Sequence, residues 1–335
     1  MTEADPVVYV TREIPDAGLD IVEPETEMHV WDGKLPPGKD HIVERLSELG
    51  ADGLLCLLTD EIDGEVMDAS PNLDVISTFS VGYDHIDIDA AEERGLAVGH
   101  TPGVLSETTA DFAWAMLMTT ARRTVEGSEY VLDDEWETWG PKLLTGPDVH
   151  DATIGIVGLG NIGSTVARRT AGFDMEVLYT DATRQAETEA ALEEEGVDVE
   201  YTGKDDLLER SDFVTMHVPL MEATRHYIGE SELRTMQDDA VLINTSRGPI
   251  VDTAALDRAL DEGWIARAGL DVTDPEPLPG DHEITRHVPE KLVVTPHIAS
   301  ASIETRDRMA TMAAENLVAG LAGEELPNSA IADRR

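Results

Sequence analysis

Residues 154–181, IGIVGLGNIGSTVARRTAGFDMEVLYTD, predict a strand, a glycine-rich turn, a helix and a second strand. The apolar, β-branched run at 154–157 is typical of a buried parallel strand. Gly158, Gly160 and Gly163 follow in G-x-G-x-x-G spacing. This spacing suits a tight turn, close approach of the backbone to a pyrophosphate, and packing of the helix on the strand. The alternative is an ordinary strand-to-helix turn in another α/β protein.

An acid at the end of the second strand favours a nucleotide site. Asp181 stands 18 positions after Gly163, about where the ribose hydroxyls of NAD would be met. A strand before the glycines, a helix after them and an acid in this place together predict a dinucleotide-binding unit.

Short strands alternate with amphipathic helices on both sides of this segment. Strands are expected at 7–10, 27–31, 53–58, 73–79 and 96–99 before it, and at 197–201, 213–218, 240–244, 266–272 and 292–295 after it. Alternation of this kind predicts an α/β fold with parallel sheets covered by helices on both faces. A complete α/β unit therefore precedes the glycine-rich turn.

Residues 106–130 predict one long helix that is apolar over much of its girth. Trp136 and Trp139 follow in a loop. We expect this helix to be buried between domains or subunits. A last helix is expected at 301–321, and the residues after Leu326 are expected to fray.

The composition indicates a folded protein with an acidic surface. Hydrophobic residues make up 41% of the 335 residues, and 69 acidic residues outnumber 24 basic ones, for a formal charge of −45. The acids are spread along a chain that keeps its apolar periodicity, unlike a disordered acidic segment. A high-salt cytoplasm screens such a charge. The same surface disfavours nucleic acid, whose phosphates need cationic contacts.

The charge leads to a prediction about salt. We expect the fold to loosen when salt is removed, because unscreened repulsion then opposes the compact state. Circular dichroism and thermal melting in molar salt and in salt-free buffer measure this. Full secondary structure and a cooperative melt without salt would contradict it.

Localisation and metal content are predicted from what the sequence lacks. The acidic start, MTEADP, has no apolar core of a signal peptide, and no run approaches about 18 apolar residues. Cys56, the only cysteine, lies in an apolar run and is expected in the core. No HxH, HExxH or CxxC spacing supports a metal. We expect a cytoplasmic protein without membrane contact or a metal site.

Three ionisable residues at or just after strand ends suit the reduction of a 2-oxo acid. Arg247 supplies a planar, permanently charged fork for the substrate's carboxylate and carbonyl. His297 is the side chain best suited to give a proton to the carbonyl oxygen near neutral pH. Glu276 is the candidate carboxylate that orients the histidine and favours its protonated form. Each residue taken alone has a structural alternative, such as a helix cap or a rigid turn.

The carboxyl ends of parallel strands bring such residues together. Pro219, Arg247, Asp271 and His297 each follow an expected strand. Ligands bind at this edge of an open parallel sheet, so we expect the four to converge near the nucleotide. His226, His282 and His287 are expected on the surface instead.

Four separated motifs carry a family resemblance that spans nearly the whole chain. GLGNIG at 158–163, NTSRG at 244–248, LDVTDPEPL at 270–278 and TPHIAS at 295–300 resemble signatures of the D-isomer-specific 2-hydroxyacid dehydrogenases. The segment 80–116, SVGYDHIDIDAAEERGLAVGHTPGVLSETTADFAWAM, is most similar to the glyoxylate/hydroxypyruvate reductase branch.

The resemblance implies roles for the catalytic and substrate-binding residues. Arg247 is expected to bind the substrate's carboxylate and carbonyl, and His297, paired with Glu276, to be the acid/base. The backbone amides of Val81 and Gly82 are expected to hold the substrate carboxylate.

The resemblance also implies the cofactor contacts. The expected contacts are Thr109, Gly158, Leu159, Gly160, Asn161, Ile162, Gly163, Asp181, Pro219, Thr224, Thr245, Ser246, Arg247, Asp271, His297 and Ala299. Of these, Asp271 is expected to meet the nicotinamide carboxamide, and the turn at 160–162 the pyrophosphate. Asp181 favours NAD(H), because a carboxylate repels a 2′-phosphate. Arg184 could reach such a phosphate if Asp181 turns away, which leaves NADP(H) open.

The implied architecture has two doubly wound parallel-sheet domains. Residues 1–102 with 301–335 form a flavodoxin-like substrate domain, and residues 103–300 form a Rossmann-type NAD(P)-binding domain. The helix 106–130 is expected at the interface of a homodimer.

Three activities stay open at this point. The favoured one is reduction of glyoxylate, hydroxypyruvate or pyruvate. The alternatives are a phosphoglycerate- or phosphonate-type dehydrogenase and a cofactor-sensing protein similar to the family's corepressor branch. Against the last, the acidic surface and short tails offer no obvious recruiting extension.

Overall fold

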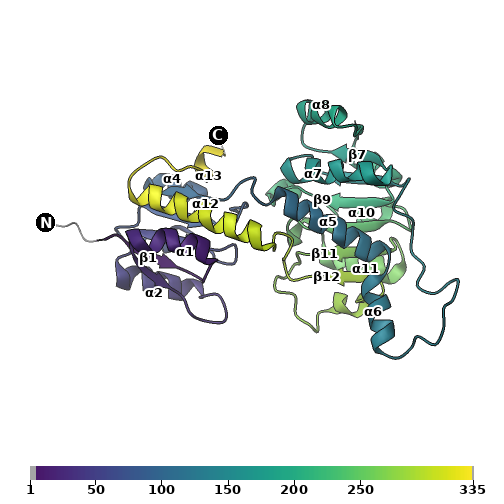
Figure 1. The fold of residues 1–335 in the computed structure, drawn as a ribbon, viewed down its shortest axis with the longest axis horizontal. Helices are drawn as coiled ribbons and strands as arrows, with labels where there is room; N and C mark the ends of the chain where they lie inside the picture. The colour runs from purple at the N-terminus through teal and green to yellow at the C-terminus, as the bar shows by residue number, and fades with distance from the viewer. Residues whose placement is uncertain (1–4, 334–335) are drawn as a thin grey trace. The chain divides into compact units, whose positions relative to one another are not determined.

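The computed structural model describes residues 5–333, and the chain divides into two compact units. Unit 1 runs to Leu105 and resumes at Ala301, and unit 2 spans Ser106–Ser300. Figure 1 shows that each unit is a parallel sheet with helices packed on it. In the described part of the chain, no helix is both long and apolar enough to cross a membrane.

Unit 1 holds a five-stranded parallel sheet of order β2-β1-β3-β4-β5. Its strands are β1 (Val7–Val10), β2 (Glu27–Val30), β3 (Gly53–Cys56), β4 (Val75–Thr78) and β5 (Ala97–Gly99). Its helices are α1 (Asp16–Val22), α2 (Lys39–Leu49), α3 (Gly64–Met67), α4 (Ile88–Arg94), α12 (Ile303–Leu321) and α13 (Ala330–Asp333). The strand order is that of flavodoxin-like folds, and the direction of winding reverses between β1 and β3.

Unit 2 holds a seven-stranded parallel sheet of order β12-β11-β10-β9-β6-β7-β8. Its strands are β6 (Thr153–Val157), β7 (Glu176–Thr180), β8 (Val199–Tyr201), β9 (Phe213–Met216), β10 (Val241–Asn244), β11 (Arg267–Leu270) and β12 (Leu292–Val294). Its helices are α5 (Ser106–Ala121), α6 (Thr124–Leu132), α7 (Asn161–Thr170), α8 (Ala186–Glu194), α9 (Lys204–Arg210), α10 (Glu230–Thr235) and α11 (Thr253–Glu262). The winding reverses between β6 and β9, as in Rossmann-type sheets. The predicted fold class of two parallel-sheet α/β domains is confirmed.

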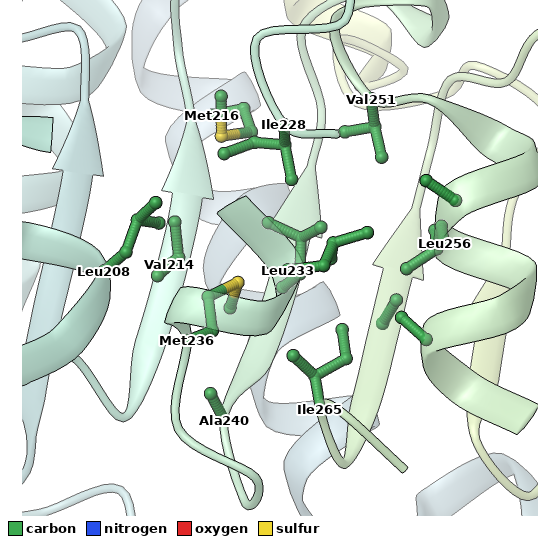
Figure 2. Packing of buried hydrophobic residues seen from close by; sticks show 14 of the residues in the cluster. Leu208, Val214, Met216, Ile228, Leu233, Met236, Ala240, Val251, Leu256 and Ile265 are labelled. Carbon is green, nitrogen blue, oxygen red and sulfur yellow. The ribbon is translucent and has the colours of Figure 1, made fainter. Parts of the chain in front are cut away.

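Apolar residues of the strands and covering helices form the core of unit 2. Figure 2 shows one such cluster, in which Val214 and Met216 of β9 lie among Leu233, Ile228 and other side chains of the elements packed over the sheet. Both faces of a parallel sheet are covered, so its strands are apolar along their whole length. Strand β10, for example, is buried at all four positions. Cys56 is fully buried in unit 1, as expected.

The expected single helix at 106–130 is wrong, because two helices occupy this stretch. Arg123 adopts a left-handed backbone with φ of 53° between α5 and α6. An L residue in that conformation cannot continue a right-handed helix. The Arg123 side chain donates to Glu126 in the first turn of α6 and to the carbonyl of Thr145. No glycine or proline in the sequence marks this break.

Two further expectations, the exposure of His287 and the fraying of the residues after Leu326, are also wrong. His287 is buried, and its ring lies 3.2 Å from a carboxylate oxygen of Asp257. Of the residues expected to fray after Leu326, those at 327–332 are held in place, and 334–335 lie outside the described residues. The Asn328 amide donates to Asn316 of α12, and Ala330 is fully buried. His226 is exposed and His282 partly exposed.

Candidate active site

The glycine-rich turn after β6 has the geometry its spacing predicts. Gly158 has a φ of +95°, and a Cβ there would lie 2.8 Å from the carbonyl oxygen of His217. A Cβ on Gly163 would lie 2.0 Å from the carbonyl oxygen of Gly158, so α7 packs directly on the turn. A Cβ on Gly160 would meet nothing within 4 Å. The turn thus presents open space at the start of α7, whose N-cap makes no side-chain hydrogen bond.

Asp181 is joined to this turn at the end of β7. One of its carboxylate oxygens accepts a hydrogen bond from the Leu159 amide at 2.9 Å, and the other accepts from the Ala182 amide at 2.7 Å. The acid therefore lies beside the glycine turn rather than turning away from it.

Arg184, the residue that could favour a 2′-phosphate, is engaged elsewhere. Its guanidinium donates to both carboxylate oxygens of Glu189, at 2.9 and 2.8 Å. This pairing holds the pKa of Glu189 below its ordinary value, and the hydroxyl of Tyr179 donates to the same carboxylate. An arginine paired with both oxygens of a carboxylate must give up those bonds to bind another anion.

The turn after β10 is built around buried Asn244. Its side-chain amide donates to the carbonyl of Arg247 at 2.9 Å, while its oxygen accepts from the amide and the hydroxyl of Ser246. These bonds set the backbone from which the Arg247 side chain leaves. A Cβ on Gly248 would lie 1.9 Å from the carbonyl oxygen of Thr273, so only glycine lets this turn approach the segment that carries Glu276.

His297 and Glu276 form a direct pair. Nδ1 of His297 lies 2.7 Å from a carboxylate oxygen of Glu276, and the two side chains are 21% and 35% exposed. Burial alone raises the pKa of the Glu276 carboxyl, but the hydrogen bond and charge of His297 outweigh it and hold the pKa below its ordinary value. An ionised carboxylate only accepts, so Nδ1 carries a hydrogen. Nε2 is then the ring atom that can exchange a proton with a ligand.

The loop that carries His297 is organised around Asp271. This carboxylate is 1% exposed and accepts hydrogen bonds from the Thr295 hydroxyl, the Ile298 amide and the Ala299 amide. His297 has a left-handed backbone with φ of 54°, and its amide donates to the Asp271 carbonyl at 2.8 Å. A non-glycine residue in that conformation costs about 1–3 kcal/mol and persists only where surrounding bonds hold it.

Two more expected cofactor residues lie at the same edge of the sheet. The hydroxyl of Thr224 donates to the Pro219 carbonyl at 2.6 Å, which shapes the turn after β9. The hydroxyl of Thr245 is buried and has no hydrogen-bond partner within the described residues. A buried polar atom of this kind needs a partner from a ligand or water.

The structure brings the expected residues of unit 2 to one edge of its sheet. Pro219, Arg247, Asp271 and His297 follow β9, β10, β11 and β12, which are neighbours in the sheet. Thr109 is buried on α5. Val81 and Gly82 belong to unit 1, in the turn after β4. The sequence did not single out Asn244 or the close approach at Gly248, although both lie inside the NTSRG motif.

These residues fit a dinucleotide. The open turn at Gly160 offers space for a pyrophosphate at a helix N-terminus, Asp181 lies where a ribose would follow, and Thr245 has an unused hydroxyl. Among residues 5–333, no group of three or more His, Cys, Asp or Glu side chains is arranged to hold a metal ion.

Comparisons with known proteins agree with this architecture. The model of the D-isomer-specific 2-hydroxyacid dehydrogenase NAD-binding domain matches residues 114–299. A glyoxylate reductase of Korarchaeum cryptofilum is 51% identical over 324 residues, which cover 96% of this chain and 95% of that protein.

Solved structures match over almost the full length. A crystal structure of a Thermus thermophilus protein has a TM-score of 0.88 at 43% identity, covering 97% of this chain and 99% of that one. The NADPH-dependent glyoxylate/hydroxypyruvate reductase of Sinorhizobium meliloti, in complex with NADP and malonate, has a TM-score of 0.84 at 29% identity, with 97% of each chain covered.

Proposed function

Because the chain belongs to the D-isomer-specific 2-hydroxyacid dehydrogenase family, we propose that it reduces small 2-oxo acids, namely glyoxylate, hydroxypyruvate and pyruvate, with His297 as acid/base. It is an NAD(P)-dependent oxidoreductase acting on the CH–OH group of 2-hydroxy acids. The observation that carries the proposal is the 2.7 Å contact between Nδ1 of His297 and Glu276, which leaves Nε2 for the substrate. Unit 1 serves as the substrate domain and unit 2 as the cofactor domain.

The chemistry divides between the cofactor and three side chains. A bound nicotinamide would supply the hydride for the carbonyl carbon of the 2-oxo acid. Nε2 of protonated His297 gives its proton to the carbonyl oxygen, and the ionised Glu276 stabilises the imidazolium before that transfer. Arg247 binds the carboxylate and polarises the carbonyl through its planar fork. The amides of Val81 and Gly82 hold the substrate carboxylate.

The contacts of Arg184 support NAD(H) as the preferred cofactor. Asp181 stays beside the glycine turn, and Glu189 holds Arg184, the arginine expected to be able to reach a 2′-phosphate. To bind NADPH, the protein would have to break the Arg184–Glu189 pair and place the 2′-phosphate near the like-charged Asp181 carboxylate. NADP(H) is the alternative cofactor.

Initial rates with both cofactors test the activity and the preference together. We expect oxidation of NADH with at least one of the three acids in molar salt, at a higher kcat/KM than for NADPH. Glu189→Gln frees Arg184, and we expect the NADPH to NADH ratio of kcat/KM to rise about tenfold, as for one charged contact. Glu187→Gln, an exposed acid of the same helix, is the matched control. An unchanged ratio for Glu189→Gln would show that Arg184 does not contribute to the choice between NADH and NADPH.

Two alternative activities are separated by the same assay. A phosphoglycerate- or phosphonate-type enzyme oxidises its phosphorylated or phosphonate substrate and leaves the three acids unreduced. A cofactor-sensing binding protein binds NADH tightly without turnover. The His297–Glu276 pair favours catalysis over sensing, because binding alone needs no acid/base.

Apolar side chains around α6 support a homodimer. Helix α6 buries none of its residues within the chain, and Leu132, Trp136 and Trp139 are 79%, 60% and 76% exposed. Exposed apolar groups gathered in one segment mark a contact with another protein surface.

Light scattering in molar salt tests this interface. We expect a dimer for the native chain and a monomer for Trp136→Ser combined with Trp139→Ser, because aromatic anchors dominate interface energy. Leu35→Ser removes an equally exposed apolar side chain of unit 1 and should leave the dimer intact. A dimer that survives the double substitution would place the interface elsewhere.

The acidic surface supports a high-salt cytoplasm as the working environment. Basic side chains are surrounded by acids, as at Arg210, which lies within 2.8–3.1 Å of oxygens of Glu176, Glu200 and Asp206. Exposed pairs of this kind contribute little to stability, so they leave most of the repulsion to be screened by salt.

A further inference from the structure

Three consecutive backbone carbonyls after β4 are tied to side chains or backbone within unit 1. The Ser80 carbonyl accepts from the Thr101 amide at 2.9 Å. The Val81 carbonyl accepts from Nδ1 of His100 at 2.9 Å, and the Gly82 carbonyl from the Ser80 hydroxyl at 2.6 Å. The turn that carries Val81 and Gly82 is therefore fixed peptide by peptide.

These bonds set the direction of the amides. In a trans peptide the N–H points opposite to the C=O of the same unit. The hydrogen bond to the Ser80 carbonyl therefore fixes the direction of the Val81 N–H, and the bond to the Val81 carbonyl fixes the direction of the Gly82 N–H. Among residues 5–333, no backbone carbonyl accepts a hydrogen bond from either N–H. Two neighbouring donors held in place are suited to an anion such as a carboxylate.

His100 is itself held rigidly. The residue is 3% exposed, and its ring meets Tyr83 edge-on at 5.3 Å between centroids. Its backbone amide donates to the Asn328 carbonyl, and its carbonyl accepts from the side chain of Asn316 at 2.8 Å. A carbonyl oxygen only accepts, so Nδ1 of His100 carries a hydrogen in its contact with the Val81 carbonyl.

We propose that His100 is a positioning residue that aims the Gly82 amide at the carboxylate of the 2-oxo acid. It acts through the bond from its Nδ1 to the Val81 carbonyl and touches no reacting atom. The inference rests on the proposed function, which assigns the amides of Val81 and Gly82 to the substrate carboxylate. Loss of the bond lets the 81–82 peptide rotate, and one charge-assisted hydrogen bond to the substrate is then lost.

Two substitutions separate this role from simple packing. His100→Asn keeps a donor, because the side-chain nitrogen of asparagine is as many bonds from Cα as Nδ1 of histidine. His100→Leu fills the space without a donor. For His100→Leu we expect the KM for glyoxylate and the inhibition constant of oxalate to rise about tenfold or more, the usual effect of losing a hydrogen bond to a charged group. We expect kcat and the KM for NADH to change by less than about threefold, since neither depends on this contact.

The rescue by asparagine decides the outcome. His100→Asn should bind glyoxylate and oxalate like the native protein, with both variants melting cooperatively in molar salt. If His100→Leu fails to fold, His100→Gln, whose donor is one bond too far, takes its place. Equal values for the donor and non-donor variants would overturn the inference. A native protein that reduces none of the acids would overturn the proposed function instead.

Discussion

Replacing His297 with asparagine is expected to lower kcat for reduction of the 2-oxo acid by about 10²- to 10⁴-fold, the usual contribution of general acid catalysis. Asparagine retains a side-chain donor that can face Glu276 but has no group that releases a proton near neutral pH. It also tolerates the left-handed backbone at this position, where φ is 54°. The loss then reports on the proton transfer rather than on a distorted loop.

A second histidine provides a matched control. His226 also has a left-handed backbone, with φ of 51°, but is exposed and lies in the turn after β9. His226→Asn should leave kcat and KM at native values. Steady-state rates in molar salt and NADH binding by fluorescence measure both variants. If His297→Asn kept native kcat while binding NADH, another group would be the proton donor.

The motifs predict a candidate site because the residue types and their spacing are tied to local backbone requirements. Gly158 has a φ of +95° and leaves only 2.8 Å between an added Cβ and the His217 carbonyl oxygen, and an added Cβ on Gly163 would lie 2.0 Å from the Gly158 carbonyl oxygen, so both positions require glycine. Likewise, the alternation of strands and helices places Arg247 and His297 at one edge of a parallel sheet without knowledge of any contact.

Features that depend on contacts between distant segments could not be predicted in this way. The break at Arg123 has no glycine or proline to mark it, and its side chain reaches the carbonyl of Thr145. The Glu189 carboxylate that pairs with Arg184 is also bound by the Tyr179 hydroxyl of β7, a contact between strand and helix that the spacing does not reveal. His287 was expected on the surface because its buried partner, Asp257, is 30 residues away in the sequence.

The largest consequence of such contacts concerns the loop after β12. Sequence motifs assign Asp271 to the cofactor, yet its carboxylate already accepts three hydrogen bonds from residues 295–299. These bonds hold in place the segment that carries the left-handed His297. The position of His297, the proposed acid/base, therefore depends on a buried carboxylate whose side chain contacts residues 295–299 and not the imidazole ring.

Substituting Glu276 with glutamine is the second change with a large expected effect, and it acts on the pH profile. In the native protein the pKa of Glu276 is held below its ordinary value by His297, so the carboxylate is ionised throughout the neutral range. Its charge favours the protonated ring, and this support is lost only when pH falls through the lowered pKa. Glutamine keeps a side-chain acceptor for Nδ1 but removes the charge.

The direction of the change follows from that loss. Reduction needs the protonated ring and oxidation the neutral one, so in Glu276→Gln both the alkaline limb for reduction and the acid limb for oxidation should move to lower pH. Removing an opposite charge in direct contact predicts a displacement of about one pH unit or more. On the alkaline limb of the profile, reduction should then slow about tenfold for each pH unit of displacement.

Profiles of kcat/KM from pH 5 to 9 in molar salt measure this displacement. Glu283→Gln is the control, because Glu283 is an exposed acid seven residues after Glu276. A uniform loss of rate without displacement would mean that Glu276 only orients the ring. Displacement to higher pH would mean that the carboxylate does not face the imidazolium during turnover. Displacement to lower pH in both directions of the reaction is the result that only a charge held against Nδ1 produces, since packing and orientation do not depend on the sign of the charge.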